Sequence, residues 1–406
     1  MKRPTKTTFW ILCYAGFLDW MSYGLVFPIF AAMIYDHGGA FLNLDPDTSR
    51  GLWLGILVAA SPLAQFFSSP IIGSLSDRMG RKPLLQISSL IMVGGYALSA
   101  LGVWERQLSL LILGRVVTGI GAGNIVVINS AASDVSDQTS KSKNFALIMM
   151  ANGIGLAIGP LIGGQLALKG FDVPFIASGC FTLLNFFLLT FLFSETLNKK
   201  THKYLTFLPQ FYRLLKETPL HKLRILFPAF FIFCIGWSFY WEFIPVTWIR
   251  DYELNASHIG YFYAYGSACY VLSSGVLIRP ILKRFKGLPI LFASLIALSI
   301  ALALLIHREL ILFWFCIPIQ QFLVAMIFPV GTAIVSNLAL PNKQGETLGA
   351  FQSLQSLAFS VTPFLGGSFL DLNKNMPLIF SSIAIFIAGF YLLVGYGRKL
   401  FTRGGR

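Results

Sequence analysis

The chain has 406 residues, of which 55% are hydrophobic and only 12% are charged. Soluble domains carry about 25% charged residues, so this composition excludes an ordinary water-soluble enzyme and indicates a polytopic membrane protein. The formal net charge of +14 does not indicate nucleic-acid binding, because the basic residues lie in short gaps between apolar segments rather than on one soluble face.

Twelve apolar segments are long enough to cross a bilayer, for which a helix needs about 20 residues. In chain order they comprise residues 9–35, 52–75, 84–103, 108–132, 145–168, 171–193, 225–249, 259–282, 288–306, 310–338, 348–370 and 376–395. The first segment is too long for the apolar part of a signal peptide and lacks a small-residue cleavage site, so we expect it to be retained. The predicted fold is all-α and integral to the membrane, with twelve transmembrane helices.

The distribution of Lys and Arg predicts the orientation of these helices. If the N-terminus is cytoplasmic, 24 of the 31 Lys and Arg residues lie in inner loops and tails, six lie in outer loops and Arg115 lies within a span. Because positive residues accumulate on the cytoplasmic side, we expect both termini to be cytoplasmic. The bacterial cytoplasmic (inner) membrane is the expected location.

Short patterns recur at about half the chain length. The pattern Pro-x-x-Gly-Gly that begins at Pro160 returns at Pro363, and two shorter matches have nearly the same spacing. Such a repeat predicts two pseudo-symmetric six-helix bundles, residues 1–194 and 225–406. Residues 195–224 would form a cytoplasmic linker, in which apolar residues between 207 and 215 favour an amphipathic helix on the membrane surface.

The loop between the second and third spans, residues 73–83, combines glycines with opposite charges. Glycines permit a tight turn, and an acid at a helix end can pair with nearby bases in a contact that breaks and re-forms. A basic cytoplasmic turn that only fixes the topology is the alternative. The candidate residues of this gating loop are Gly73, Asp77, Arg78, Gly80, Arg81 and Lys82.

Three ionisable residues stand out within the spans: Asp19, Arg115 and Glu242. A charge at mid-bilayer costs about 2.5 to 3.5 kcal/mol, so each is expected to face a cavity or a partner. Asp19 is the candidate proton carrier, because burial favours the neutral form of a carboxyl group, and Arg115 would promote proton release. The alternatives are a packing hydrogen bond for Asp19, a buried tie for Arg115 and an outer-boundary position for Glu242.

Polar residues within the spans are the candidates for lining a substrate cavity. They are Tyr23, Asn124, Glu242, Gln320 and Gln355. Glu242 lies in the segment Trp-Ser-Phe-Tyr-Trp-Glu, and the mixture of an acid with aromatic surface suits an amphipathic or cationic substrate.

The fifth span carries a glycine motif made of Gly155, Gly159, Pro160, Gly163 and Gly164. Glycines repeated every four residues give a smooth helix face against which another backbone packs closely, and Pro160 bends the helix by removing a hydrogen bond. Ordinary helix packing without a role in transport is the alternative interpretation.

Four patterns together resemble a known family. Gly73-x-Leu75-x-Asp77-Arg78-x-Gly80-Arg81-Lys82 resembles the loop signature of the major facilitator superfamily, and Arg115-x-x-x-Gly119-x-Gly121-Ala122 is similar to its fourth-helix motif. The glycine motif resembles that of its proton-driven exporters, and Leu18-Asp19-x-x-x-x-Gly24-x-x-x-Pro28 resembles the tetracycline and multidrug antiporter branch.

This resemblance implies a secondary transporter that exports a small amphipathic compound in exchange for protons, by alternating access of its two bundles. Asp77 and Arg81 would then form an inner gate with the eleventh helix, and the bent fifth helix would seal the pathway against proton leak. The expected partners are a small-molecule substrate, protons and the lipid bilayer, with no nucleic acid, and the protein is expected to be a monomer.

Two other functions remain open on the sequence. The same fold serves proton-coupled importers of a nutrient or a metal chelate such as a siderophore, and a transporter-like chain can also act as a sensor or scaffold. An enzyme is not expected, because no nucleophile, base and orienting acid converge. Neither a metal nor another cofactor is expected, since the cysteines are scattered singly and no phosphate-binding loop occurs.

Overall fold

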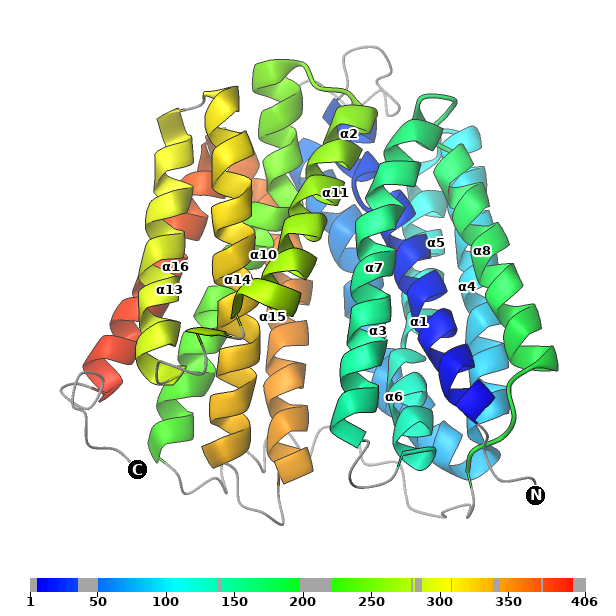
Figure 1. Cartoon of the computed structure of the whole chain (residues 1–406). Coiled ribbons are helices and arrows are strands. Elements are labelled where there is room, and N and C mark those ends of the chain that lie inside the picture. Colours follow the sequence, from blue (N-terminus) through cyan, green and yellow to red (C-terminus); the bar gives the residue numbers. More distant parts are fainter. Residues whose placement is uncertain are drawn as a thin grey trace. The chain divides into compact units, whose positions relative to one another are not determined.

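The computed structural model describes residues 6–35, 50–136, 141–197, 221–278, 280–281, 287–307, 309–338, 344–373 and 375–396. Within these ranges the chain is helical apart from short turns and contains no strand (Figure 1), which confirms the all-α prediction. The first eight helices are α1 (Lys6–Val26), α2 (Ile29–Tyr35), α3 (Arg50–Met79), α4 (Arg81–Trp104), α5 (Leu108–Ala122), α6 (Ile125–Asp134), α7 (Lys141–Ala167) and α8 (Val173–Phe191). The later helices are α10 (His221–Tyr252), α11 (Ala256–Leu272), α13 (Gly287–Leu304), α14 (Leu310–Leu338), α15 (Gln344–Leu372) and α16 (Met376–Tyr396).

The predicted spans are helices in the structure. Among the described residues, ten helical segments are long and apolar enough to cross a membrane. The two remaining predicted spans correspond to α11, which is helical but only 17 residues long, and α15, which is helical but carries polar side chains such as Ser and Gln. The chain is therefore a multi-pass membrane protein.

Three predicted spans are interrupted rather than continuous. The first divides into α1 and α2 at Phe27 and Pro28, since proline has no N–H to continue the helical bonding. The fourth divides into α5 and α6 at Gly123 and Asn124. The eighth passes from α11 into a π-helical turn, Ser273–Leu277. Such breaks within a membrane are tolerated where the backbone groups find other partners. At the break between α5 and α6, the side chain of Gln65 on α3 donates to the carbonyl oxygen of Ala122.

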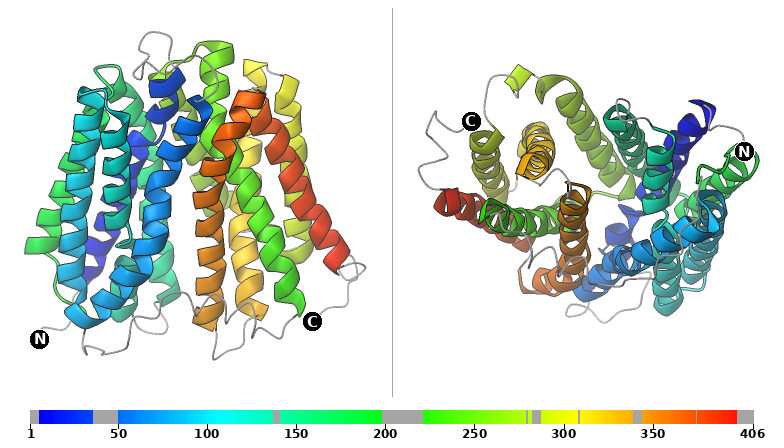
Figure 2. Two further views of the ribbon diagram at one scale, coloured as in Figure 1. Left: turned by 180° about the vertical axis from the view of Figure 1, so that it is seen from behind. Right: turned by 90° about the horizontal axis from the view of Figure 1, so that it is seen from below.

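The chain forms two compact units. The first comprises Met1–Leu205 with Trp248–Ser267, and the second comprises Thr206–Thr247 with Ala268–Arg406. In the first unit, α1 packs along α7 and α8, while α4 packs against α5 and α8 (Figure 2). In the second unit, α13 packs against α14 and α16. The predicted division into residues 1–194 and 225–406 stays a prediction, and most of the predicted linker, residues 198–220, lies outside the described residues.

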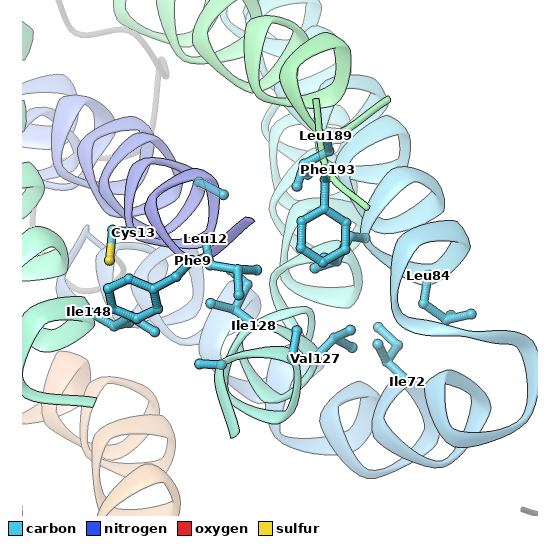
Figure 3. Close-up of a cluster of buried hydrophobic side chains, with 14 residues drawn as sticks. Phe9, Leu12, Cys13, Ile72, Leu84, Val127, Ile128, Ile148, Leu189 and Phe193 are labelled. Atoms are coloured by element: carbon cyan, nitrogen blue, oxygen red, sulfur yellow. The ribbon is translucent and has the colours of Figure 1, made fainter. Parts of the chain in front are cut away.

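A cluster of buried apolar side chains joins six helices of the first unit (Figure 3). Phe9 and Leu12 of α1 meet Ile128 of α6, and the cluster extends to Ile72 of α3 and Leu84 of α4. Lipid is as apolar as these side chains, so removing them from lipid contributes little stability. Their close packing instead favours one particular arrangement of the helices. The sequence predicted a loop at residues 73–83, but this segment is helical except at Gly80, because α3 and α4 extend beyond their apolar parts. Since Ile72 and Leu84 flank the segment, which we still call the gating loop, the cluster fixes both of its ends.

Candidate functional site

Asp19 lies at the junction of three helical elements of the first unit. Asn124 Nδ2, at the break between α5 and α6, donates to Asp19 Oδ2 at 2.8 Å. Asn185 Nδ2, on α8, donates to Asp19 Oδ1 at 2.9 Å and also approaches the carbonyl oxygen of Ala15 at 3.3 Å. The two asparagines are 2% and 1% exposed. We call Asp19, Asn124 and Asn185 the Asp19 cluster.

Local sequence explains why these residues meet. Ser178 and Thr182 precede Asn185 by seven and three residues, so the three side chains lie on one face of α8. Ser178 Oγ donates to the carbonyl oxygen of Ser22 at 2.9 Å, and Thr182 Oγ1 donates to Ser22 Oγ at 3.4 Å. Small polar side chains of this kind hold α8 close to α1 and bring Asn185 within reach of the carboxyl group.

The sequence predicted Asp19 and Asn124 as functional residues but assigned Asn124 to a substrate cavity. The structure places the Asn124 amide on the carboxylate of Asp19, and the role of Asn124 in a substrate cavity stays a prediction. Asn185 was missed, although a lone amide among the phenylalanines and leucines of the sixth span is itself an unusual signal.

Arg115 of α5 is almost completely buried, with 1% exposure. Its guanidinium carbon lies 4.8 Å from the ring centre of Phe30 on α2, and Tyr23 and Tyr96 are near enough to interact with it electrostatically. Within the described ranges, Nε and Nη1 have no hydrogen-bond partner and no salt bridge joins Arg115 to Asp19. Any effect of Arg115 on Asp19 therefore acts through the electric field rather than through a direct bond.

Glu242 lies in the second unit, on α10, and is 9% exposed. Its Oε1 accepts a hydrogen bond from Ser238 Oγ at 3.0 Å, whereas Oε2 has no partner in the part of the chain that the structure describes. The ring of Trp237 lies 5.5 Å from that of Tyr240 and 5.7 Å from that of Trp241. Helical spacing places these three rings on other sides of α10, whereas Phe239, three residues before Glu242, lies on the same face as the acid.

Of the remaining cavity candidates, the two glutamines are buried, whereas Tyr23 is partly exposed. Gln320 of α14 is 1% exposed and lies beside Tyr240, while Gln355 of α15 is 7% exposed. Tyr23 of α1, in the first unit, stacks on Phe27 with ring centres 5.7 Å apart. The shared cavity that the sequence predicted for these residues stays a prediction.

The gating loop is held by a network inside the first unit. Arg81 Nη1 pairs with Asp77 Oδ1 at 2.6 Å and donates to Ser76 Oγ at 2.5 Å. Arg81 Nε pairs with Asp134 Oδ2, at the end of α6, at 3.1 Å. Asp77 and Arg81 are thus joined to each other, as the loop pattern indicated, and Asp134 is a third member that sequence reasoning did not identify.

Glu195, just after α8, secures the other side of this loop. Its Oε1 accepts from the backbone N–H of Arg81 at 2.9 Å, and its Oε2 accepts from that of Lys82 at 3.1 Å. The carboxylate therefore caps the N-terminus of α4, where the helix dipole favours negative charge. Gly80 has a φ of +115°, and a Cβ at this position would lie 2.5 Å from Glu195 Oε2. The backbone conformation thus favours glycine, and a larger residue would also displace the Glu195 carboxylate from its capping position.

The other predicted loop residues lie at its start. A Cβ on Gly73 would meet Val126 Cγ1 of α6 at 3.1 Å, so this glycine lets α3 approach α6 closely. Arg78 lies in the last turn of α3.

The glycine motif of α7 packs directly on the backbone of α1. A Cβ on Gly159 would lie 2.6 Å from the carbonyl oxygen of Met21, and a Cβ on Gly155 or Gly163 would also meet an α1 carbonyl oxygen. On another side of α7, a Cβ on Gly164 would lie 2.6 Å from the carbonyl oxygen of Ala256. Pro160 lies inside α7, next to Gly24 of α1. The predicted backbone packing is therefore present, while its role in sealing the pathway stays a prediction.

The described helices and their enclosed polar residues define a polytopic helical membrane protein. The model of the Major Facilitator Superfamily matches residues 12–307 and 226–403. The chain belongs to the major facilitator superfamily.

Three curated relatives carry names that refer to resistance. The chain is 26% identical to the class C tetracycline resistance protein of Escherichia coli over 358 residues, which cover 86% of each chain. It is 26% identical to the quinolone resistance protein NorA of Staphylococcus aureus (strain MRSA252), with 95% of each chain covered. It is 25% identical to multidrug resistance protein 2 of Bacillus subtilis (strain 168), with 97% of this chain and 94% of the relative covered. The resemblance to tetracycline and multidrug exporters is thereby confirmed.

Solved structures share the fold at lower identity. The human organic anion transporter MFSD10 is 18% identical, with a TM-score of 0.71 over 95% of this chain and 99% of that one. A D-xylose–proton symporter is 13% identical, with a TM-score of 0.73 over 95% of this chain and 96% of that one. At this level of identity the likeness shows the fold alone, and it confirms the predicted major facilitator fold.

Proposed function

We propose that this protein exports a small amphipathic compound across the membrane in exchange for protons, by alternating access. The observation that carries the proposal is the Asp19 cluster. Asp19 is an acid inside a membrane span, and both of its oxygens accept hydrogen bonds from neutral amides rather than from a cation. An acid that is held without a paired base keeps the freedom to bind and release a proton, which is what a proton carrier requires.

Arg115 supports the same role from a distance. A buried positive charge favours the ionised form of nearby acids, and two of its nitrogens are not bound to other groups in the described residues. We expect this field to help Asp19 release its proton once substrate has entered. The energy source is then the proton gradient.

The packing of α7 supports export rather than import. The resemblance connects this glycine motif with proton-driven exporters, and the structure has the backbone contact of Gly155, Gly159 and Gly163 with α1 that a seal requires. The resistance names of the relatives agree with this direction.

The surroundings of Glu242 support an amphipathic substrate. Among the described residues this buried carboxylate has one oxygen without a partner, and Phe239 lies three residues earlier on the same helix face, so a negative charge is combined with flat apolar surface. Aromatic rings attract cations as well as apolar groups. We therefore expect Glu242 to contact substrate, together with Gln320 and Gln355.

The gating loop would link these events to the motion of the two bundles. Asp77, Arg81 and Asp134 hold the inner ends of α3, α4 and α6 together, so these helices would move as one body. We place the gating loop and both termini on the cytoplasmic side, in agreement with the distribution of Lys and Arg.

The test uses inside-out vesicles that contain the purified protein under an imposed pH gradient. A compound library is screened by counterflow, and the substrate found is then used to measure proton flux. Asp19→Asn should abolish substrate-dependent proton flux while the protein stays folded. Asp172→Asn, in the turn before α8, is the matched control and should retain the flux.

Three results would contradict the proposal. Unchanged flux in Asp19→Asn would remove Asp19 from the mechanism. Substrate movement that does not depend on the pH gradient would exclude proton exchange. Uptake with protons, rather than exchange against them, would establish the importer instead.

A further inference from the structure

The two asparagines of the Asp19 cluster are arranged to serve a charged acid. A carboxylate only accepts hydrogen bonds, and each oxygen of Asp19 receives one N–H, from Asn124 at 2.8 Å and from Asn185 at 2.9 Å. Hydrogen bonds donated to the ionised form favour that form over the neutral acid. Because both amides are almost fully buried, they do so where little water is available to take their place.

Few ionisable groups face the cluster from the helices packed around it. α4 contributes Tyr96, α5 contributes Arg115 and α1 itself contributes Tyr23, all of which interact electrostatically with one another or with Asp19. The membrane part of α7, residues 147–167, has no ionisable side chain, and α8 has only the exposed Cys180. On α6 the only one is Asp134, which is paired with Arg81. The two amides bond the carboxylate directly, Asn124 at Oδ2 and Asn185 at Oδ1.

We propose that Asn124 and Asn185 are positioning residues that clamp the ionised form of Asp19 and so set the pH at which it takes up a proton. The inference deepens the function proposed above and rests on Asp19 being the proton-coupling acid. It assigns Asn124 to the proton step rather than to the substrate cavity, and it adds a residue of α8 to that step.

The clamp can also adapt to the neutral acid. When Asp19 binds a proton from the aqueous pathway, one oxygen becomes an O–H donor and its former N–H partner faces another donor. The Oδ1 atom of Asn185 has no hydrogen-bond partner within the described ranges. Rotation of this amide by half a turn would therefore present an acceptor to the new O–H, with loss of the bond from Nδ2 to the carbonyl oxygen of Ala15. Release of the proton to the water on the opposite side returns the amide to its first orientation.

Rotation of Asn185 also changes the contact between α8 and α1. In the ionised state, Asn185 Nδ2 is shared between Asp19 Oδ1 and the carbonyl oxygen of Ala15. In the neutral state, after the amide has rotated, Asn185 Nδ2 no longer donates to Asp19 Oδ1 or to the carbonyl oxygen of Ala15. Protonation of Asp19 would thus loosen one polar contact between the two helices, which gives the proton a way to alter their packing.

The experiment measures the pH dependence of substrate exchange for the full chain in proteoliposomes. Asn185→Leu and Asn124→Leu each remove one amide donor at similar side-chain volume. The matched control is Thr182→Val, one turn earlier on α8, which removes a buried hydrogen bond to Ser22 without touching Asp19. Because charge-assisted bonds are stronger than neutral ones, loss of the donor outweighs loss of the acceptor. Each leucine variant should move the midpoint of the pH profile upward by about one unit, a tenfold gain in proton affinity.

The outcomes separate the clamp from the function on which it rests. If the wild-type protein does not exchange substrate for protons, the proposed function fails. If it does, and the Asn185→Leu midpoint coincides with that of Thr182→Val or moves downward, the clamp is wrong. If a leucine variant does not fold, Asn185→Ala and Asn124→Ala replace it, because alanine fits wherever asparagine did and the same upward shift is required. The double variant should move the midpoint further than either single variant.

Discussion

Gly159 offers a direct test of how closely α7 and α1 pack. A Cβ at this position would lie 2.6 Å from the carbonyl oxygen of Met21 and 2.8 Å from Cα of Gly24, and ordinary contact begins at 3.4 Å. The replacement Gly159→Ala is therefore about 0.8 Å too close to the Met21 oxygen. The obstructing atoms belong to the backbone, so no side chain can rotate away and the two helices must separate. Overpacking of this kind costs about 1–3 kcal/mol.

The same helix provides the control for this prediction. A Cβ on Gly153 would meet no atom within 4 Å, so Gly153→Ala should gain about 1 kcal/mol or less from the higher helix propensity of alanine. The two substitutions are chemically identical and share the gain in helix propensity, so we expect their free energies of unfolding to differ by the overpacking cost of about 1–3 kcal/mol. Titration with SDS in mixed micelles, followed by tryptophan fluorescence, measures this difference. Equal unfolding curves for the two variants would refute the close approach of α1 and α7.

Two further predictions concern the gating loop. Asp77→Asn removes the salt bridge between Asp77 and Arg81, and we expect the resting population to shift toward the cytoplasm-open form while the protein stays folded. Cysteine labelling from each side of the membrane measures this shift. An unaltered labelling pattern would contradict the prediction. Glu195→Gln weakens the cap of α4 by about 0.5–2 kcal/mol. Hydrogen exchange at the backbone amides of Arg81 and Lys82 should therefore become faster. The control Glu105→Gln, at the opposite end of α4, should leave the exchange rates of those amides unchanged.

The membrane spans could be predicted from sequence because lipid imposes a simple requirement. Every crossing needs a long apolar helix, so hydropathy alone located the spans, including those that became α11 and α15. The breaks at Pro28 and Asn124 could not be placed in the same way. A membrane helix tolerates proline or glycine when its neighbours supply hydrogen bonds, and those neighbours are defined only by the tertiary structure. At the second break, Gln65 Nε2 donates to the carbonyl oxygen of Ala122 at 3.0 Å.

The candidate site was predicted in part for a related reason. A charge within a span is costly and therefore conspicuous, so Asp19, Arg115 and Glu242 stood out in the sequence. Asn185 and Glu195 did not. A neutral amide costs less to bury than a charge, and a glutamate next to the membrane surface is unremarkable until α8 ends beside the start of α4. Both residues act through partners more than 100 positions away in the chain.

The bonds of Glu195 have a mechanical consequence. Besides capping α4, its Oε1 accepts from the backbone N–H groups of Thr196 and Leu197, each at 2.9 Å. Thr196 Oγ1 in turn reaches Asp134 Oδ2 at 3.3 Å. The segment that follows α8 is thus attached, through Glu195 and Thr196, to the same site that holds Arg81. A pulling force on this segment would act on these bonds before it acted on the helices.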